Sequence, residues 1–372
     1  MRQKVVYIIS FLEKSLPMEW VVMNLDRTRY DLSFIMIGKE DTPFIRFLEA
    51  QQVPCTVVPY NAKKDLLSGF FTILRLLRRL RPEVVHVHLF YAGMIGIPAA
   101  WMAGVRKRIY TRHYSTYHHD FYPKGVYIDR VINFLSTKVV AISPVVEKVL
   151  LAREHVPPAK VLRIPHGFDF SYFTRQPAEA EAARTRYHIP ADAYPVVGVI
   201  SRYIKLKGIQ YIIEAFAALR KQYPQAHLVL GNAQGDYKPV LAKQLAGLPA
   251  ETYTEILFEE NVRALYAMFD VFVHVPITPE GEAFGQIYVE ALAMRVPSVF
   301  TLSGIAREFV EDRVHARVVP YENADAIREA TVDLLEDAGL RATLATRGYD
   351  AVVNEFGMPQ MIRRLDAAYC ED

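Results

Sequence analysis

Residues 282–290 read Glu-Ala-Phe-Gly-Gln-Ile-Tyr-Val-Glu, and they follow the apolar run Val-Phe-Val-His-Val at 271–275. The apolar run is typical of a buried parallel strand, and residues 288–294 have the pattern of a helix. Glu282 and Gly285 are therefore expected where the strand gives way to the helix. Free backbone N–H groups and the helix dipole at that point favour an anion such as a diphosphate, which a glycine allows to come close.

Two carboxylates, Glu282 and Glu290, stand on either side of this glycine. With one acid in the loop and the other inside the helix, both can contact opposite ends of one elongated ligand. The alternative is a helix-start carboxylate and a solvated helix residue, which would stabilise the fold by only about 0.3–1 kcal/mol.

Size and composition predict two domains in a reducing compartment. A chain of 372 residues with 51% hydrophobic content exceeds the usual single core. The two cysteines, Cys55 and Cys370, are too few for a disulfide framework or a cysteine-based zinc site. Residues 5–12 are interpreted as a first core strand rather than a signal peptide. The uncharged run 89–105 contains Pro98 and is short for a spanning helix, so we expect a buried helix.

The net charge of +3 hides an asymmetry between the halves of the chain. Residues 1–172 hold 24 Lys and Arg against 14 Asp and Glu, whereas residues 173–372 hold 20 against 27. The basic first half favours an anionic partner or surface, with a merely solvated basic face as the alternative.

Apolar runs alternate with amphipathic helical segments along the chain, and the polar, Ala-rich stretch 174–192 is the expected linker. This alternation predicts α/β architecture, with two doubly wound parallel sheets that bind ligands at the carboxyl ends of their strands. Strands are expected at 5–10, 32–37, 56–58, 84–88, 108–111, 139–142, 161–164, 196–201, 226–230, 254–257, 271–275, 298–301 and 316–319, and helices include 66–80, 145–151, 210–222, 262–269, 288–294 and 324–336.

A basic loop follows the first strand expected in the second domain. Arg202 and Lys207-Gly208 lie between this strand and the next helix. Both cations are therefore expected at the carboxyl edge of the sheet, where a guanidinium fork and an ammonium group can grip a diphosphate. An ordinary solvated loop is the alternative, but the glutamate segment is expected at the same edge of the same sheet.

Together these segments resemble glycosyltransferase family 4, the retaining nucleotide-sugar transferases of the GT-B fold. The family's signature of two glutamates separated by seven residues is matched by Glu282 and Glu290. Further matches are Phe284-Gly285, Glu290-Ala291, Arg202, Lys207-Gly208 and the segments 81–88, 110–113, 140–143 and 164–169.

The resemblance implies a GT-B fold of two Rossmann-like domains with a cleft between them. Residues 1–172 would form the acceptor domain, residues 173–355 would bind the donor, and the C-terminal helix within 356–372 would pack back on the first domain. It also implies retention of anomeric configuration and no metal cofactor. The chain contains no Asp-x-Asp triplet, so the donor's charge would be neutralised by protein groups.

The resemblance also assigns roles to individual residues. Arg202 and Lys207 would hold the diphosphate, Glu290 the ribose hydroxyls, and Glu282 the sugar hydroxyls. His113 would lie near the reacting sugar, with a structural buried histidine as the alternative. The backbone of Phe284, Gly285, Gln286 and Ile287 would cradle sugar and phosphate.

Some positions depart from the family pattern. The loop 10–19 has no glycine, although a glycine pair is common there. Arg295 replaces a usual glycine, His166 a usual asparagine, and Ser303-Gly304 a usual glycine pair. Each of these changes is expected to reshape the site without removing one of its charges.

Other segments leave more than one interpretation open. The Arg- and Tyr-rich segment 106–130 suits single-stranded nucleic acid, a sugar-lined acceptor site or a phosphorylated lipid head group, and its position favours the latter two. The helix at 66–80 suits either an anionic membrane surface or a core with basic solvent positions. His86 and His88 share one face of a strand, a spacing compatible with metal ligation, although packing against the next helix is the preferred interpretation.

The function expected is transfer of a sugar from a nucleotide-sugar donor to a glycan or lipid-linked acceptor, in the cytoplasm or at the inner face of the membrane. Two alternatives stay open, namely a nucleotide-sugar epimerase of the same architecture and a basic nucleic-acid-binding protein.

Overall fold

The computed structural model describes residues 2–60 and 65–370, which form two compact units. The first unit comprises residues 1–168 and 358–372, and the second comprises residues 169–357. The expected boundary at 172 thus lies close to the observed division. Met1, residues 61–64 and residues 371–372 of the predicted first domain lie outside the described residues.

The first unit is built on a parallel sheet of seven strands in the order β3-β2-β1-β4-β5-β6-β7. The order reverses between β1 and β4, so the carboxyl ends of these two strands form the topological switch point. The strands are β1 (Gln3–Ser10), β2 (Tyr30–Gly38), β3 (Cys55–Pro59), β4 (Val84–His88), β5 (Lys107–Arg112), β6 (Lys138–Ala141) and β7 (Val161–Arg163).

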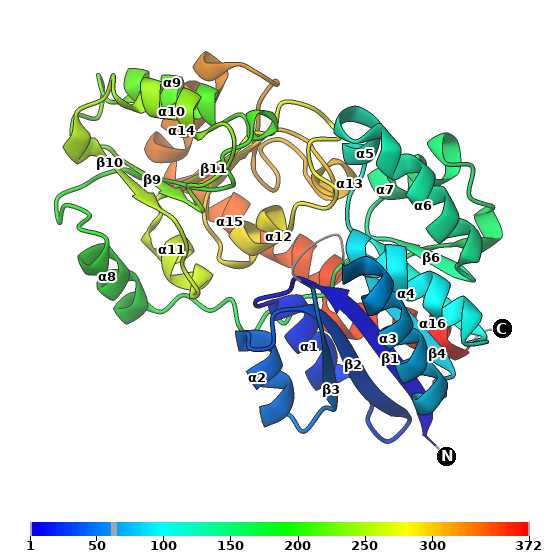
Figure 1. The fold of residues 1–372 in the computed structure, drawn as a ribbon. Helices are drawn as coiled ribbons and strands as arrows, with labels where there is room; N and C mark the ends of the chain where they lie inside the picture. The colour runs from blue at the N-terminus through cyan, green and yellow to red at the C-terminus, as the bar shows by residue number, and fades with distance from the viewer. Residues whose placement is uncertain (1, 61–64, 371–372) are drawn as a thin grey trace. The chain divides into compact units, whose positions relative to one another are not determined.

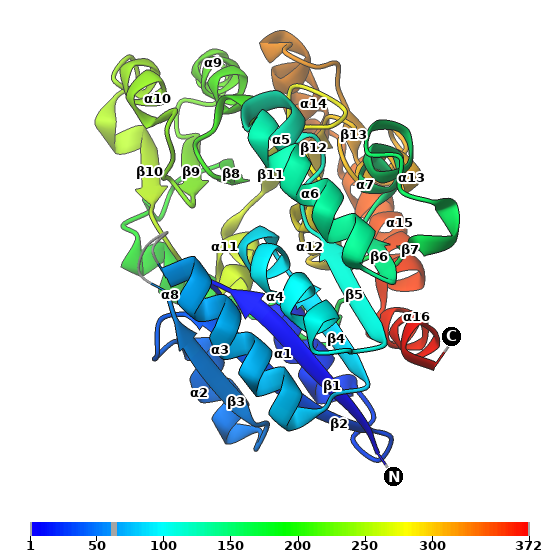
Figure 2. The same cartoon turned by 45° about the vertical axis from the view of Figure 1, so that its right-hand side comes forward.

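Helices cover both faces of this sheet, as doubly wound topology requires. Figures 1 and 2 show α3 and α4 over one face, whereas α1 and the C-terminal helix α16 contact each other. The described helices of this unit are α1 (Leu16–Asn24), α2 (Pro43–Ala50), α3 (Asp65–Leu80), α4 (Phe90–Met102), α5 (Tyr117–Phe121), α6 (Pro123–Leu135), α7 (Pro144–Lys148), the π-helical η1 (Val149–Arg153), the 3-10 helix η2 (Pro158–Lys160) and α16 (Met358–Cys370).

The glycine-free loop after β1 turns without a glycine because Phe11 adopts a left-handed conformation with φ of 52°. Its backbone N–H donates to the carbonyl of Ile37, which keeps the loop beside β2. Ser15 then caps α1 by accepting a hydrogen bond from Met18 N–H. The absence of glycine therefore costs conformational strain at one residue rather than a change of fold.

The second unit repeats the plan with six parallel strands in the order β10-β9-β8-β11-β12-β13. The order reverses between β8 and β11, which pair directly. The strands are β8 (Val196–Ile200), β9 (His227–Gly231), β10 (Tyr253–Ile256), β11 (Val271–His274), β12 (Ser298–Phe300) and β13 (Arg317–Val318).

The helices of the second unit enclose an apolar core that includes Val197, Leu230 and Val273 from the three central strands. Helices α9 and α14 pack against each other, as do α12 and α15. The described helices are α8 (Pro177–Arg186), η3 (Lys205–Lys207), α9 (Ile209–Leu219), α10 (Lys238–Leu245), η4 (Ala250–Thr252), α11 (Val262–Met268), α12 (Gln286–Ala293), α13 (Ala306–Phe309), α14 (Ala324–Glu336) and α15 (Ala338–Phe356).

Two expectations about local structure need correction. The stretch 174–192, expected to be a plain linker, contains helix α8, which packs against α11 and is tied to it by an ion pair of 2.8 Å between Glu179 and Arg263. The helix expected at 145–151 is α-helical only to Lys148 and continues as the π-helical η1. For α8, tertiary packing decides the structure of a segment whose own pattern is weak.

Candidate functional site

The basic loop and the glutamate segment meet at the switch point of the second sheet. Arg202 and Lys207 follow β8, while Glu282 and Gly285 follow β11, and these two strands are neighbours. Ligands of open parallel sheets bind outside the carboxyl ends of strands at such a point. The fold therefore brings together two segments that are far apart in sequence, as the alternating pattern predicted.

Glu282 is held by two basic side chains. Its Oε1 lies 2.5 Å from Nζ of Lys207 and 2.9 Å from Nε2 of His274, and its backbone N–H donates to Oγ of Ser303 at 3.0 Å. Burial opposes ionisation, but the charge of Lys207 and the hydrogen bond from His274 outweigh it and lower the pKa of Glu282 to about 2. Glu282 is therefore an ionised carboxylate fixed in position.

Glu290 lies in the opposite electrostatic situation. It is half-buried within α12, and Oε2 accepts a hydrogen bond of 3.0 Å from the hydroxyl of Tyr266. Burial raises the pKa of Glu290 to about 7, although the Tyr266 hydroxyl favours the ionised form. The two glutamates thus differ in protonation near neutral pH, which suits one to a charged contact and the other to exchangeable hydrogen bonding.

Two glycines shape the backbone at the starts of α9 and α12. Gly208 has φ of 72°, and a Cβ there would lie 2.0 Å from the carbonyl oxygen of Val275. Gly285 has φ of 88° and is the N-cap of α12, where a Cβ would meet the ring of Tyr288 at 2.7 Å. No other residue fits either position without displacing its neighbours.

The remaining residues predicted for the donor site differ in their solvent exposure. Arg202 is exposed directly after β8, and Gln286 and Ile287 are half-buried in the first turn of α12. Phe284 is buried, and its carbonyl accepts from the backbone N–H of Ile305 at 2.8 Å. This hydrogen bond holds the backbone before α12 against a third segment, which contains Ile305.

Sequence reasoning missed three partners, namely His274, Tyr266 and Ser303. His274 stood in the quoted strand, and its polarity within an apolar run was the available signal. Ser303 was noted only as a departure from a glycine pair, yet its hydroxyl contacts Glu282. Nothing in the local pattern around Tyr266 distinguished it from a core residue.

Arg295, the other departure in this segment, follows the end of α12 with φ of 55°. Glycine is favoured at this left-handed position after a helix, which explains why a glycine is usual there. The Arg295 guanidinium lies 3.8 Å from the centre of the Tyr349 ring, and this cation–π contact offsets part of the strain.

His113, the candidate from the first unit, follows β5 and is half-buried. Its Nε2 lies 3.1 Å from Nδ1 of His88, and its ring stacks on that of His166 at 5.5 Å. Burial, and then the neighbouring histidines, lower its pKa well below the ordinary value, so it is neutral at pH 7. His113 lies in the first unit, and the other candidate residues lie in the second.

His86 and His88 share one face of β4, with ring centres 4.3 Å apart. His86 contacts the hydroxyls of Tyr369 and Thr111, at 2.8 and 2.7 Å. Its helical partner is thus α16 rather than the next helix along the chain. Within residues 2–60 and 65–370, no group of three His, Cys, Asp or Glu side chains is arranged to hold a metal ion.

The segment 106–130, predicted to contact an acceptor or another ligand, is divided between buried and exposed side chains. Tyr110 and Arg112 are buried, and Arg112 pairs with Asp129 and Glu154. Tyr117 and Tyr127 are exposed. The carboxyl-terminal half of β5 is buried on both faces, so part of the basic and aromatic set lies inside the protein, which composition alone does not reveal.

Two family models match the chain. Residues 24–172 match the model described as Glycosyltransferase Family 4, and residues 185–351 match the one described as Glycosyl transferases group 1. The two matches fall in the first and second unit respectively, apart from a few residues at the boundary.

The curated proteins that the chain resembles are also named as glycosyltransferases. A GDP-mannose-dependent alpha-(1-6)-phosphatidylinositol monomannoside mannosyltransferase of Mycolicibacterium smegmatis is 32% identical over 200 residues, or 52% of this chain and 51% of that enzyme. The chain thus spans about half the length of this relative. The capsular polysaccharide biosynthesis glycosyltransferase CapM of Staphylococcus aureus is 25% identical over 84% of each chain.

Among solved structures, Anabaena HepE in complex with UDP and glucose superposes with a TM-score of 0.84 at 19% identity, covering 100% of both chains. At this identity the likeness shows the fold, which is GT-B. No helix in the described part of the chain combines the length and apolar character needed to cross a membrane.

Proposed function

Because the chain belongs to the family-4-type glycosyltransferases, of transferase class EC 2.4, we propose that it moves a sugar from a nucleotide sugar to a glycan or lipid-linked acceptor. The product would be a glycolipid or a polysaccharide. The relatives named above act in the synthesis of both kinds of molecule, and HepE binds UDP and glucose.

The donor would bind at the second unit, in the donor domain predicted at residues 173–355. The observation that supports this most is the meeting of Lys207, Glu282 and Gly285 at one switch point. Lys207 and Arg202 would face the diphosphate, with the N–H groups at the start of α12 beside them. Glu282 would accept hydrogen bonds from the sugar hydroxyls, and Glu290 from those of the ribose.

Charge at the phosphate is the strongest means of acceleration in this proposal. Cleavage of the glycosidic bond places negative charge on the departing phosphate oxygen and positive charge on the anomeric carbon. The diphosphate would compete with Glu282 for Lys207, while His274 keeps the carboxylate in place. A fixed cation beside a developing anion is worth about 3 kcal/mol in comparable sites.

Retention of configuration and independence of metal complete the proposal for the second unit. Retention follows from the family resemblance, with the acceptor attacking from the face that the diphosphate leaves. Charge neutralisation by Arg202, Lys207 and the start of α12 would leave no role for a bound divalent ion. Activity in excess chelator, with the anomer of the product assigned by NMR, tests both points.

The first unit would take the acceptor, with His113 near the reacting sugar. Its helix α3 also has features of a membrane contact. Leu67 and Phe71 are 72% and 57% exposed, and Arg75, Arg78 and Arg79 continue the same exposed side of the helix. Its buried side, with Ile73 and Leu77, packs in the core. An anionic lipid surface would receive both the apolar and the basic groups.

A thermal-shift panel of nucleoside diphosphates and nucleotide sugars tests donor binding directly. The preferred donor is then assayed with lipid and glycan acceptors. Stabilisation by one nucleotide class, followed by acceptor-dependent release of the nucleoside diphosphate, supports the proposal. Conversion of the sugar nucleotide without an acceptor would instead identify an epimerase. Binding of oligonucleotides without any nucleotide-sugar effect would contradict both enzymatic readings.

A further inference from the structure

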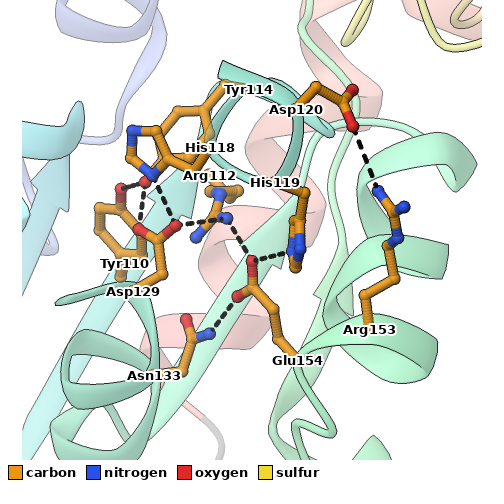
Figure 3. A network of polar contacts seen from close by, with 10 residues as sticks. All are labelled: Tyr110, Arg112, Tyr114, His118, His119, Asp120, Asp129, Asn133, Arg153 and Glu154. Atoms are coloured by element: carbon orange, nitrogen blue, oxygen red, sulfur yellow. Dashed lines mark hydrogen bonds and ion pairs between the residues drawn. The ribbon is translucent and has the colours of Figure 1, made fainter. Parts of the chain in front are cut away.

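The first unit contains a buried network of charged side chains at the carboxyl end of β5 (Figure 3). Arg112, Asp129 and Glu154 have no exposed side-chain surface. Arg112 Nη2 donates to Asp129 Oδ2 at 2.9 Å and to Glu154 Oε1 at 2.5 Å. One guanidinium therefore joins β5 to α6, which carries Asp129, and to the turn after η1, which carries Glu154.

Asp129 also binds Tyr114, on the loop that follows β5, and His118, in helix α5. The Tyr114 hydroxyl donates to its Oδ1, and His118 Nδ1 lies 2.6 Å from its Oδ2. The Arg112 guanidinium further covers the Tyr114 ring at 3.9 Å from the ring centre. In Figure 3 these groups converge on the single carboxylate of Asp129.

Arg112 and Tyr114 are the immediate sequence neighbours of His113. Both are bound to Asp129, so the backbone is fixed on either side of His113 by the same carboxylate. The His113 ring is in turn limited by His88 and by stacking on His166. A reacting side chain requires such support, because a misplacement of about 1 Å can cost about 10²-fold in rate.

We propose that Asp129 is a positioning residue, which fixes His113 near the reacting sugar through Arg112 and Tyr114. This proposal rests on the proposed function, in which His113 lies near the reacting sugar. Asp129 itself contacts no substrate in this scheme. It acts by holding the strand end of β5 in one conformation.

Glu154 supplies a matched comparison within the same network. It is as buried as Asp129 and pairs with the same nitrogen of Arg112. Its other contacts are Asn133 Nδ2 at 2.7 Å and His119 Nε2 at 3.4 Å, and none is with Tyr114. Removing its charge perturbs the buried network to a similar degree but leaves both neighbours of His113, Arg112 and Tyr114, bound to Asp129.

The test compares Asp129→Asn with Glu154→Gln in the full chain. Both changes keep the side-chain shape and remove one buried charge, and thermal unfolding reports how much each destabilises the fold. We expect Asp129→Asn to lower kcat by about 10- to 100-fold with the donor KM unchanged. The loss of kcat in Glu154→Gln should be several-fold smaller than in Asp129→Asn, although the two variants have similar melting temperatures. Equal losses of kcat in the two variants would overturn the proposal.

A second measurement separates positioning from activity. Protein labelled with ¹³C-histidine gives a Cε1–H resonance for His113, assigned by its loss in His113→Gln. We expect this resonance to shift in Asp129→Asn and to stay in place in Glu154→Gln. An unmoved resonance in Asp129→Asn overturns the proposal, whereas a shift in a protein that transfers no sugar would refute the proposed function alone.

If Asp129→Asn does not fold, Tyr114→Phe provides an alternative test of the role of Asp129. It deletes one hydroxyl donor to Asp129 and leaves every buried charge paired. A smaller loss of kcat, with a shift of the His113 resonance in the same direction, is the expected result. Unchanged kcat together with an unchanged resonance would contradict the role of Asp129.

Discussion

Lys207 Nζ lies 2.5 Å from Oε1 of Glu282, so the two residues expected to contact different parts of a donor are paired with each other. The pair joins the loop after β8 to the loop after β11. Neither group is left as an isolated buried charge, and the pairing sets the position of Lys207 before any phosphate arrives. This relationship leads to the first prediction.

Replacing Lys207 by alanine is expected to lower the rate of sugar transfer by about 10²-fold, because about 3 kcal/mol of charge stabilisation is lost at the phosphate. Initial rates at saturating donor measure the effect. Lys205→Ala is the control, since Lys205 is an exposed lysine in the same short 3-10 helix. Equal rates for Lys207→Ala and wild type would refute the assigned role.

Nucleotide affinity is expected to rise with pH through about 7, where Glu290 ionises and becomes a full acceptor for the ribose hydroxyls. Calorimetric titration of a nucleoside diphosphate between pH 6 and 8.5 measures this dependence. Glu290→Gln serves as the control for ionisation of the nucleotide itself. If the variant shows the same pH dependence as wild type, Glu290 is not the group responsible.

The same raised pKa has a consequence for stability. The folded carboxyl holds its proton to higher pH than the unfolded one, so the contribution of Glu290 is full below about pH 4.5 and is lost as the pH rises through 7. We therefore compare the melting temperature of Glu290→Gln with that of wild type, without a nucleotide, at pH 5 and at pH 8. The difference, variant minus wild type, is expected to be larger at pH 8. An equal difference in melting temperature at both values would contradict the raised pKa.

Gly208→Ala is expected to destabilise the second unit and weaken nucleotide binding, because the new methyl group would overlap the Val275 carbonyl oxygen. Left-handed backbone costs a non-glycine residue about 1–2 kcal/mol, and the overlap adds about 1–3 kcal/mol. Gly104→Ala separates these two costs, since Gly104 has φ of 76° with nothing within 4 Å of a Cβ. Equal shifts in melting temperature for both variants would show that the overlap is relieved without cost.

The first unit is expected to lose stability as the pH falls below about 6.5. Burial lowers the pKa of His86 to about 3 and that of His166 to about 4, so the unfolded chain takes up protons that the folded chain does not. Each such proton costs about 1.4 kcal/mol per pH unit within that window.

Thermal unfolding between pH 7.5 and 4.5 measures this loss. His86→Gln, which retains hydrogen-bonding atoms toward Tyr369 and Thr111, should reduce the slope. His155→Gln, at an exposed position, should leave it unchanged. A wild-type melting temperature that is flat across this range would show that the buried histidines accept protons in the folded state.

Binding to anionic vesicles is expected to fall at least about tenfold in Leu67→Ser/Phe71→Ser, because the two side chains bring a few kcal/mol of apolar burial. Sedimentation with phosphatidylglycerol vesicles, compared with phosphatidylcholine vesicles, measures it. Phe258→Ser is the control, since Phe258 is 66% exposed but lies in the second unit. Equal sedimentation of the double variant and wild type would show that α3 does not contact the membrane.

Much of the fold was predictable because central parallel strands such as β4, β8 and β11 are buried on both faces and so appear as apolar runs. The strand at 84–88 and the helix at 324–336 have the predicted limits. Lys207-Gly208 and Gly285 were predictable for a related reason, because strand ends and helix starts are local features that glycine marks. Helix α8 was missed because its alanine-rich stretch has no apolar stripe, and only its packing on α11 shows its place.

The sequence by itself determined two doubly wound sheets, the location of Arg202, Lys207 and Glu282 after strand ends, and that of Glu290 inside the following helix, since these follow from periodicity along the chain. Only the tertiary structure decided that Lys207 pairs with Glu282, that Tyr266 meets Glu290, and that Arg112 is buried against Asp129 and Glu154. Periodicity fixes the face on which a side chain lies but not its neighbour on another element. The protonation of Glu282 and Glu290 depends on those neighbours and on burial, so it was settled only when the strands and helices were packed.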